Sequence, residues 1–133
     1  KAAPSMDGYR QLFEDHDALE AEWYARTGIY PCHPTIVLKD TVVAANPDLP
    51  QLVFDALVKS KSIYLEKLHA GQGTSKEDQK LKRLAGIVGP DPIPYGLTPN
   101  RPAIETLMKY AEQQKLIPAP LELDALFYDC EVT

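Results

Sequence analysis

The chain has 133 residues, of which 44% are apolar and 25% are charged, and its formal net charge is −5. This length and composition are those of one globular domain, and they exclude an intrinsically disordered chain. The acidic balance argues against nucleic-acid binding, which needs a basic face, and no apolar run approaches the roughly 20 residues that cross a bilayer as a helix.

The N-terminal third predicts one helix followed by one strand. Asp15 or Asp17 can cap a helix that runs to about Thr27, and Gly28 can end it. Two prolines then keep the chain extended up to the segment 35–38. That segment is β-branched and apolar without alternation, which predicts a short strand buried on both faces.

The middle of the chain predicts three helices. A short one is expected at 41–45, where Asn46 and a following proline stop it. The pattern at 49–69 places apolar residues at the 3.6-residue period and predicts the longest helix. A capping box at 74–77 predicts a third helix, which runs from about residue 75 to residue 87.

The last third begins with the proline-rich loop 89–96 and continues as a helix to about Gln114. Thr98 is one candidate N-cap for this helix, but we prefer Asn100 because Pro102 then lies where no backbone donor is needed. A short terminal helix is expected at 121–127. One buried strand cannot form a sheet, so either the chain is mostly helical or its strand joins strands that this sequence lacks.

Motifs with strong chemical meaning are missing from the sequence. It contains no phosphate-binding glycine loop, no metal-spaced histidine pair and no nucleophile elbow, so we expect no cofactor and no metal ion. Cys32 and Cys130 are too few for a disulfide framework. We expect two ordinary thiols, although the two residues would pair if the fold brought them together.

Four side chains are candidates for a polar site. His33 lies in a proline-bracketed turn before the predicted strand, a common position for functional groups. Tyr30 and Tyr95 lie in proline-glycine loops, where they either contact an aromatic ligand or cover the core. Arg101, in the first turn of a helix, is poorly placed for the helix dipole, which favours an anionic partner, with Glu105 as the alternative partner.

Several segments together resemble the C-terminal part of the 4,5-dihydroxyphthalate decarboxylase-like family. They are EWYARTGIYP at 22–31, TIVL at 35–38, DPIPYGL at 91–97 and NR at 100–101, with a following helix through Tyr110. The resemblance covers about residues 8–127. It implies an α/β fold, namely the C-terminal portion of a type 2 periplasmic-binding-protein-like fold, mostly helical with one or few strands. Residues 1–30 would then end the second lobe and cross over, and residues 31–133 would contribute a strand and helices to the first lobe.

The resemblance implies two functions. One is decarboxylation of a hydroxylated aromatic dicarboxylate in the cytoplasm, with His33 or Tyr95 as the general acid. The other is non-enzymatic capture of a small anionic or aromatic solute by a periplasmic binding protein of an ABC transport system. Substrate-binding roles would fall to Arg101, Tyr30, Thr35 and Asn100.

The implied partners are a small aromatic or anionic ligand and either a missing N-terminal lobe or another copy of the chain. The family pattern has a histidine directly before the strand threonine, whereas this sequence has Pro34 there and His33 one position earlier. That difference favours a member that only binds its ligand.

Overall fold

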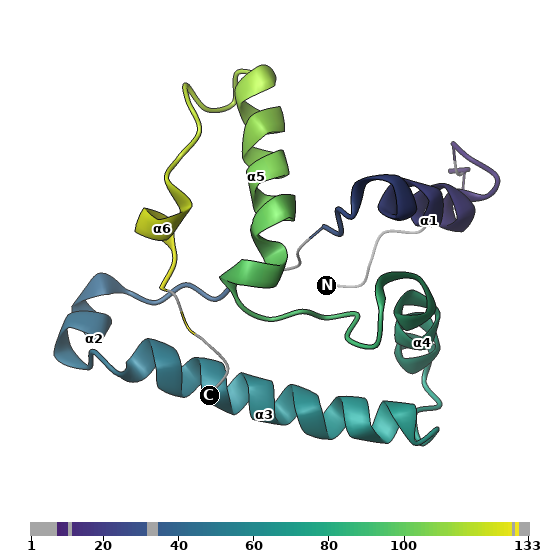
Figure 1. Ribbon diagram of the computed structural model, residues 1–133, viewed down its shortest axis with the longest axis horizontal. Coiled ribbons are helices and arrows are strands. Elements are labelled where there is room, and N and C mark those ends of the chain that lie inside the picture. The colour runs from purple at the N-terminus through teal and green to yellow at the C-terminus, as the bar shows by residue number, and fades with distance from the viewer. Residues whose placement is uncertain (1–7, 11, 32–34, 129, 131–133) are drawn as a thin grey trace.

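The computed structural model describes residues 8–10, 12–31, 35–128 and 130. Helices are the regular elements of these residues, and Figure 1 shows them as an open frame along the longest helix. In chain order they are α1 (His16–Thr27), α2 (Asp40–Ala45), α3 (Leu49–His69), α4 (Lys76–Val88), α5 (Leu97–Gln113) and α6 (Leu123–Leu126).

The predicted α/β fold is wrong for the described residues, which contain no strand. The segment 35–38, which was predicted to be a strand, has no regular secondary structure and forms no backbone ladder with another described residue. A strand exists only where a second extended segment supplies donors and acceptors, and the described chain offers none beside it. Two of its three apolar residues are exposed, Ile36 at 62% and Val37 at 86%, and Leu38 is half-buried.

Local signals fixed the helix ends largely as predicted. Asp15 caps α1 by accepting a hydrogen bond from the backbone of Ala18, and Gly28 ends it with a left-handed φ of 65°. The capping box of α4 is formed by Ser75 and Asp78, one residue later than predicted. Each side chain accepts a hydrogen bond from the other residue's backbone N–H.

The N-terminus of α5 differs from the prediction. The helix begins at Leu97 after Gly96, so Pro102 lies inside it rather than in its first turn. Pro102 removes one intrahelical donor. The Asn100 Nδ2 donates to the Pro94 carbonyl at 2.9 Å and to the Gly96 carbonyl at 2.8 Å. These bonds hold the loop 94–96 to the first turn of α5.

The core of the described chain is small. Its buried apolar residues come from five different elements or loops and are Val43, Pro50, Leu68, Pro92, Leu97, Ala103 and Leu123. The chain exposes 10734 Å², whereas a compact monomer of its mass exposes about 7000 Å². None of the described helices is long and apolar enough to span a membrane.

Candidate functional site

The described residues form a mainly apolar groove of about 770 Å³. Its walls are formed by the segment 35–38, the first half of α3, the loop before α5 and the segment after α6. The apolar wall includes Val53, Phe54, Leu57, Ile93, Leu97, Ile104 and Phe127. Ligand pockets for small molecules have about this size and this mainly apolar lining.

Four of the six predicted site residues line this groove, although they are up to 70 positions apart in the sequence. They are Tyr30, Thr35, Tyr95 and Asn100. His33 lies outside the described residues, so its predicted role as an acid stays a prediction. Arg101 lines a different hollow.

Tyr30 packs edge-on against Tyr24, with ring centroids 6.5 Å apart and ring planes at 87°. Tyr24 is itself fixed, because its hydroxyl donates to the Val88 carbonyl at 3.2 Å. Burial, and then the negative charge of Glu20, raise the pKa of the Tyr30 phenol. A raised pKa suits Tyr30 to donating a hydrogen bond to a ligand and makes it a poorer source of a transferred proton.

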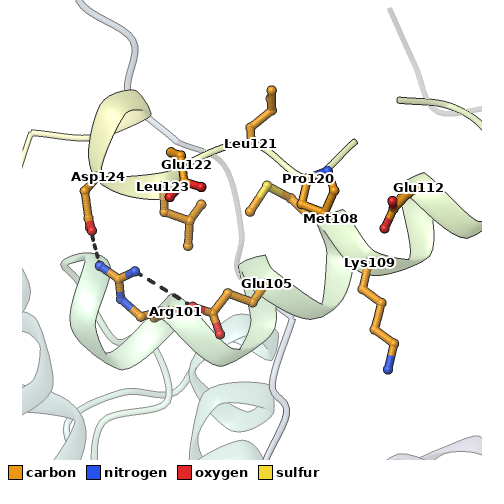
Figure 2. Close-up of a pocket in the computed structure, with 10 residues that line it drawn as sticks. All are labelled: Arg101, Glu105, Met108, Lys109, Glu112, Pro120, Leu121, Glu122, Leu123 and Asp124. Carbon is orange, nitrogen blue, oxygen red and sulfur yellow. Dashed lines mark hydrogen bonds and ion pairs between the residues drawn. The ribbon is translucent and has the colours of Figure 1, made fainter. Parts of the chain in front are cut away.

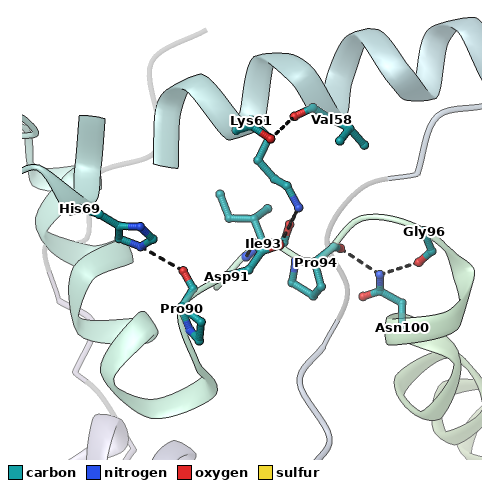
Figure 3. Close-up of polar contacts among 10 residues, drawn as sticks. Val58, Lys61, His69, Pro90, Asp91, Ile93, Pro94, Gly96 and Asn100 are labelled. Carbon is teal, nitrogen blue, oxygen red and sulfur yellow. Dashed lines mark hydrogen bonds and ion pairs between the residues drawn. The ribbon is translucent and has the colours of Figure 1, made fainter. Parts of the chain in front are cut away.

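Tyr95 is held at the groove by a cation that the sequence analysis missed. The Lys61 ammonium lies 4.3 Å from the centre of the Tyr95 ring, in cation–π geometry. The same ammonium donates to the Asp91 carboxylate at 2.6 Å and to the Ile93 carbonyl at 3.0 Å, as Figure 3 shows. Only 10% of the Lys61 side chain is exposed. Its position four residues after Leu57, on the groove face of α3, was the available sequence signal.

Asn100 uses its amide nitrogen within the chain. The two carbonyls that it binds, from Pro94 and Gly96, flank Tyr95 (Figure 3). The side chain therefore closes the loop that carries Tyr95 onto the start of α5. This contact is a structural use of Asn100, and its predicted substrate contact stays a prediction.

Arg101 lies between α5 and α6, in a hollow of about 260 Å³ shown in Figure 2. Its guanidinium forms an ion pair with Asp124 and approaches the Glu105 carboxylate at 3.8 Å. The partnership with Glu105 was the alternative to an external anion in the sequence analysis. Binding of a ligand carboxylate at Arg101 would have to compete with both acidic side chains.

Metal chemistry finds no support in the described part of the chain, where no three His, Cys, Asp or Glu side chains lie close enough to share an ion. Cys130 lines the groove. Cys32 lies outside the described residues. Among the described residues of the groove wall, Asp40 is the charged one.

Comparison with known proteins gives one informative relative. No model of a known protein family matches the chain. The chain is 27% identical over 124 residues to a 4,5-dihydroxyphthalate decarboxylase from Comamonas testosteroni. The match covers 90% of this chain but 37% of the relative, so the chain spans little more than a third of that protein. The match supports a distant relationship in line with the decarboxylase resemblance, and it does not bear on the periplasmic-binding-protein fold.

Proposed function

We propose that this chain belongs to a protein that decarboxylates a hydroxylated aromatic dicarboxylate such as 4,5-dihydroxyphthalate. The observation that carries the proposal is the match to the decarboxylase along 90% of the chain. The groove supports it, because an apolar wall that includes three tyrosines suits a flat ring that bears hydroxyl groups.

The reaction needs a proton at the ring carbon that carries the leaving carboxylate. A general acid donates this proton while the hydroxyl para to that carbon loses its own, which gives a dienone. The bond to the carboxylate then breaks, its electron pair restores the aromatic ring, and the ring oxygen regains a proton. Within the proposal, His33 or Tyr95 is the acid, Arg101 holds a carboxylate, and Tyr30, Thr35 and Asn100 contact the ring substituents.

Capture of a small aromatic or anionic solute without chemistry is the second candidate function. The groove wall is compatible with it, because its described residues are mostly apolar and Asp40 is the charged one among them. In that case the same residues would serve recognition alone, in a periplasmic protein. The decarboxylase would work in the cytoplasm.

Carbon dioxide release from 4,5-dihydroxyphthalate tests the enzyme proposal, and calorimetry with the same compound tests binding. The full-length protein that contains this chain is the sample for both. If Tyr95 is the acid, Tyr95→Phe should slow the release of carbon dioxide and change the affinity for the compound little. Binding without release overturns the enzyme and supports the solute-binding alternative.

Arg101→Ala tests the carboxylate contact. If the guanidinium reaches the ligand, the affinity falls about ten- to a hundredfold, as expected for a lost charge-assisted hydrogen bond. Arg83→Ala, on the exposed surface of α4, is the control. An unchanged affinity assigns Arg101 to its ion pair with Asp124.

A further inference from the structure

The loop that carries Tyr95 is held on both sides of that residue (Figure 3). On its N-terminal side, the Ile93 N–H donates to the Asp91 carboxylate at 3.0 Å, and the Ile93 carbonyl accepts from the Lys61 ammonium at 3.0 Å. On its C-terminal side, the Asn100 amide donates to two carbonyls of the loop. The backbone that flanks Tyr95 therefore has fixed partners, which is how a functional side chain on a loop is kept in one position.

Lys61 also contacts the Tyr95 ring itself. A backbone with fixed partners still leaves a tyrosine free to rotate about its side-chain bonds. The Lys61 ammonium lies 4.3 Å from the centre of the ring, where it is attracted to the negative ring face. Because the Lys61 side chain is only 10% exposed, water weakens this attraction little. The ammonium is in turn fixed by the Asp91 carboxylate at 2.6 Å, so it favours one orientation of the ring.

We propose that Lys61 is a positioning residue that orients the Tyr95 phenol for proton donation to the ring of the ligand. The role in turnover rests on the proposed decarboxylation, whereas the orientation of the phenol is a property of this chain. The contacts that carry the proposal join described residues of α3 to described residues of the loop 89–96. No segment outside this chain is needed to form them.

Orientation matters for this reaction because the proton must reach one particular carbon of the ligand ring. Misplacing a reacting group by about 1 Å can cost on the order of a hundredfold in rate, even when the ligand binds as before. The contribution of Lys61 should therefore be found in kcat and not in KM. If Lys61 only braces the loop through Asp91, its loss should lower stability and leave the kcat of the folded protein unchanged.

Turnover of 4,5-dihydroxyphthalate by the full-length protein that contains this chain tests the role in the reaction. Lys61→Met keeps the length of the side chain and removes its charge, so we expect kcat to fall about ten- to a hundredfold while KM stays within about twofold. Lys61→Arg keeps a cation for the ring and for the carboxylate, so it should retain most of the turnover.

Lys59→Met, on the exposed face of α3, is the matched control and should turn over like the wild type. Circular dichroism in the far ultraviolet confirms that each variant keeps its helices. Equal turnover by Lys61→Met and Lys59→Met overturns the proposal.

A double substitution shows whether Lys61 acts through Tyr95. Tyr95→Phe keeps an aromatic ring for the ammonium but removes the hydroxyl, so no proton donor remains for Lys61 to position. Adding Lys61→Met to Tyr95→Phe should therefore lower kcat little further, which is the non-additivity expected of two groups that act as one. The full loss in both backgrounds would mean that Lys61 acts elsewhere, and it overturns the proposal.

The environment of the Tyr95 ring can also be measured without turnover. Fluorotyrosine incorporated into the full-length protein gives fluorine resonances, and Tyr95→Phe identifies the one that belongs to this residue. Because the cation acts on the electrons of the ring, we expect Lys61→Met to move this resonance, Lys61→Arg to move it less, and Lys59→Met to leave it in place.

The resonance separates failure of this inference from failure of the proposed reaction. An unchanged Tyr95 resonance in Lys61→Met overturns the positioning role, whether or not carbon dioxide is released. A wild type that releases no carbon dioxide, but whose resonance responds as expected, overturns the decarboxylation and the role in turnover. In that case the orientation of the Tyr95 ring by Lys61 is retained.

Discussion

The two ends of α3 differ in how they are held. Its C-terminal half is braced by polar contacts, of which four reach other segments: Lys61 to Asp91 and to the Ile93 carbonyl, Tyr64 to Asp78, and His69 to the Pro90 carbonyl. We call this part, with α4 and the loop 89–95, the braced end. The N-terminal half instead faces the open groove with Val53, Phe54 and Leu57.

The difference shows what each kind of contact can do in a chain with a small core. Hydrogen bonds and ion pairs have fixed partners at fixed distances, so the braced end is specified by the chain itself. Apolar side chains stabilise a structure only when a ligand or another protein surface excludes water from them. The groove therefore stays open to a ligand or a partner, while the braced end holds the loop that carries Tyr95.

The largest expected effect is a difference in unfolding free energy between Leu→Ala substitutions at the two ends of α3. Leu68 is 2% exposed at the braced end, so we expect Leu68→Ala to cost about 2–5 kcal/mol of unfolding free energy. Leu57→Ala on the groove wall should cost about 1 kcal/mol, because that side chain is already partly hydrated. Urea unfolding followed by circular dichroism measures both. Equal losses would mean that the groove wall is packed as tightly as the braced end.

The intermediate effect sharpens the account of the braced end. Asp91→Ala leaves the ammonium of Lys61, whose side chain is only 10% exposed, without its counter-charge, and we expect a loss of about 3 kcal/mol. Lys61→Met leaves a carboxylate that is 42% exposed, which water can solvate, so about 1 kcal/mol is expected.

Urea unfolding shows which of the two variants loses more unfolding free energy. Lys59→Met, on the exposed face of α3, is the control. A larger loss for Lys61→Met than for Asp91→Ala would contradict the electrostatic explanation. It would assign the stabilisation to packing of the lysine stem against Tyr95 instead.

The helices could be predicted from the sequence because their signals are local. Asp15 and Gly28 bound α1 through contacts within a few residues, and the 3.6-residue period of 49–69 is visible without any partner. The α/β fold could not be judged in this way. The segment 35–38 has the composition of a buried strand, but pairing depends on a second segment that local sequence does not reveal.

The candidate site was predictable in part for the same reason. Tyr30, Thr35, Tyr95 and Asn100 were selected from loops and from the family resemblance, and the structure gathers them in one groove. Lys61 was missed, because a lysine on a long helix usually lies in solvent. Its burial follows from Asp91, thirty positions further on, which no local pattern connects with it.

The smallest effect concerns pH and the bond between Tyr64 and Asp78. The hydrogen bond from Tyr64, and then bonds from Ser75, lower the pKa of the Asp78 carboxyl below 3.8, while the bond to Asp78, and then burial, raise the pKa of Tyr64 above 10.0. Because the pKa of Asp78 is lower in the folded protein than in the unfolded chain, its carboxylate stabilises the fold at a pH above 3.8. This stabilisation is lost as the pH falls below 3.8. A raised phenol pKa stabilises it below 10.0, and this is lost as the pH rises further.

Tyr64→Phe should therefore be less stable than the wild type by a constant amount between about pH 5 and pH 9, and the difference should shrink on both sides. Asp78→Asn should remove the acid-side dependence of this pair. Ser75→Ala is the comparison, since it removes the hydroxyl that accepts from the Asp78 backbone N–H but keeps the bond from Tyr64, so the dependence on the alkaline side should remain. Thermal melting across this range measures the differences. A difference that does not change with pH would mean that Tyr64 stabilises the braced end by packing, and that its hydroxyl contributes nothing there.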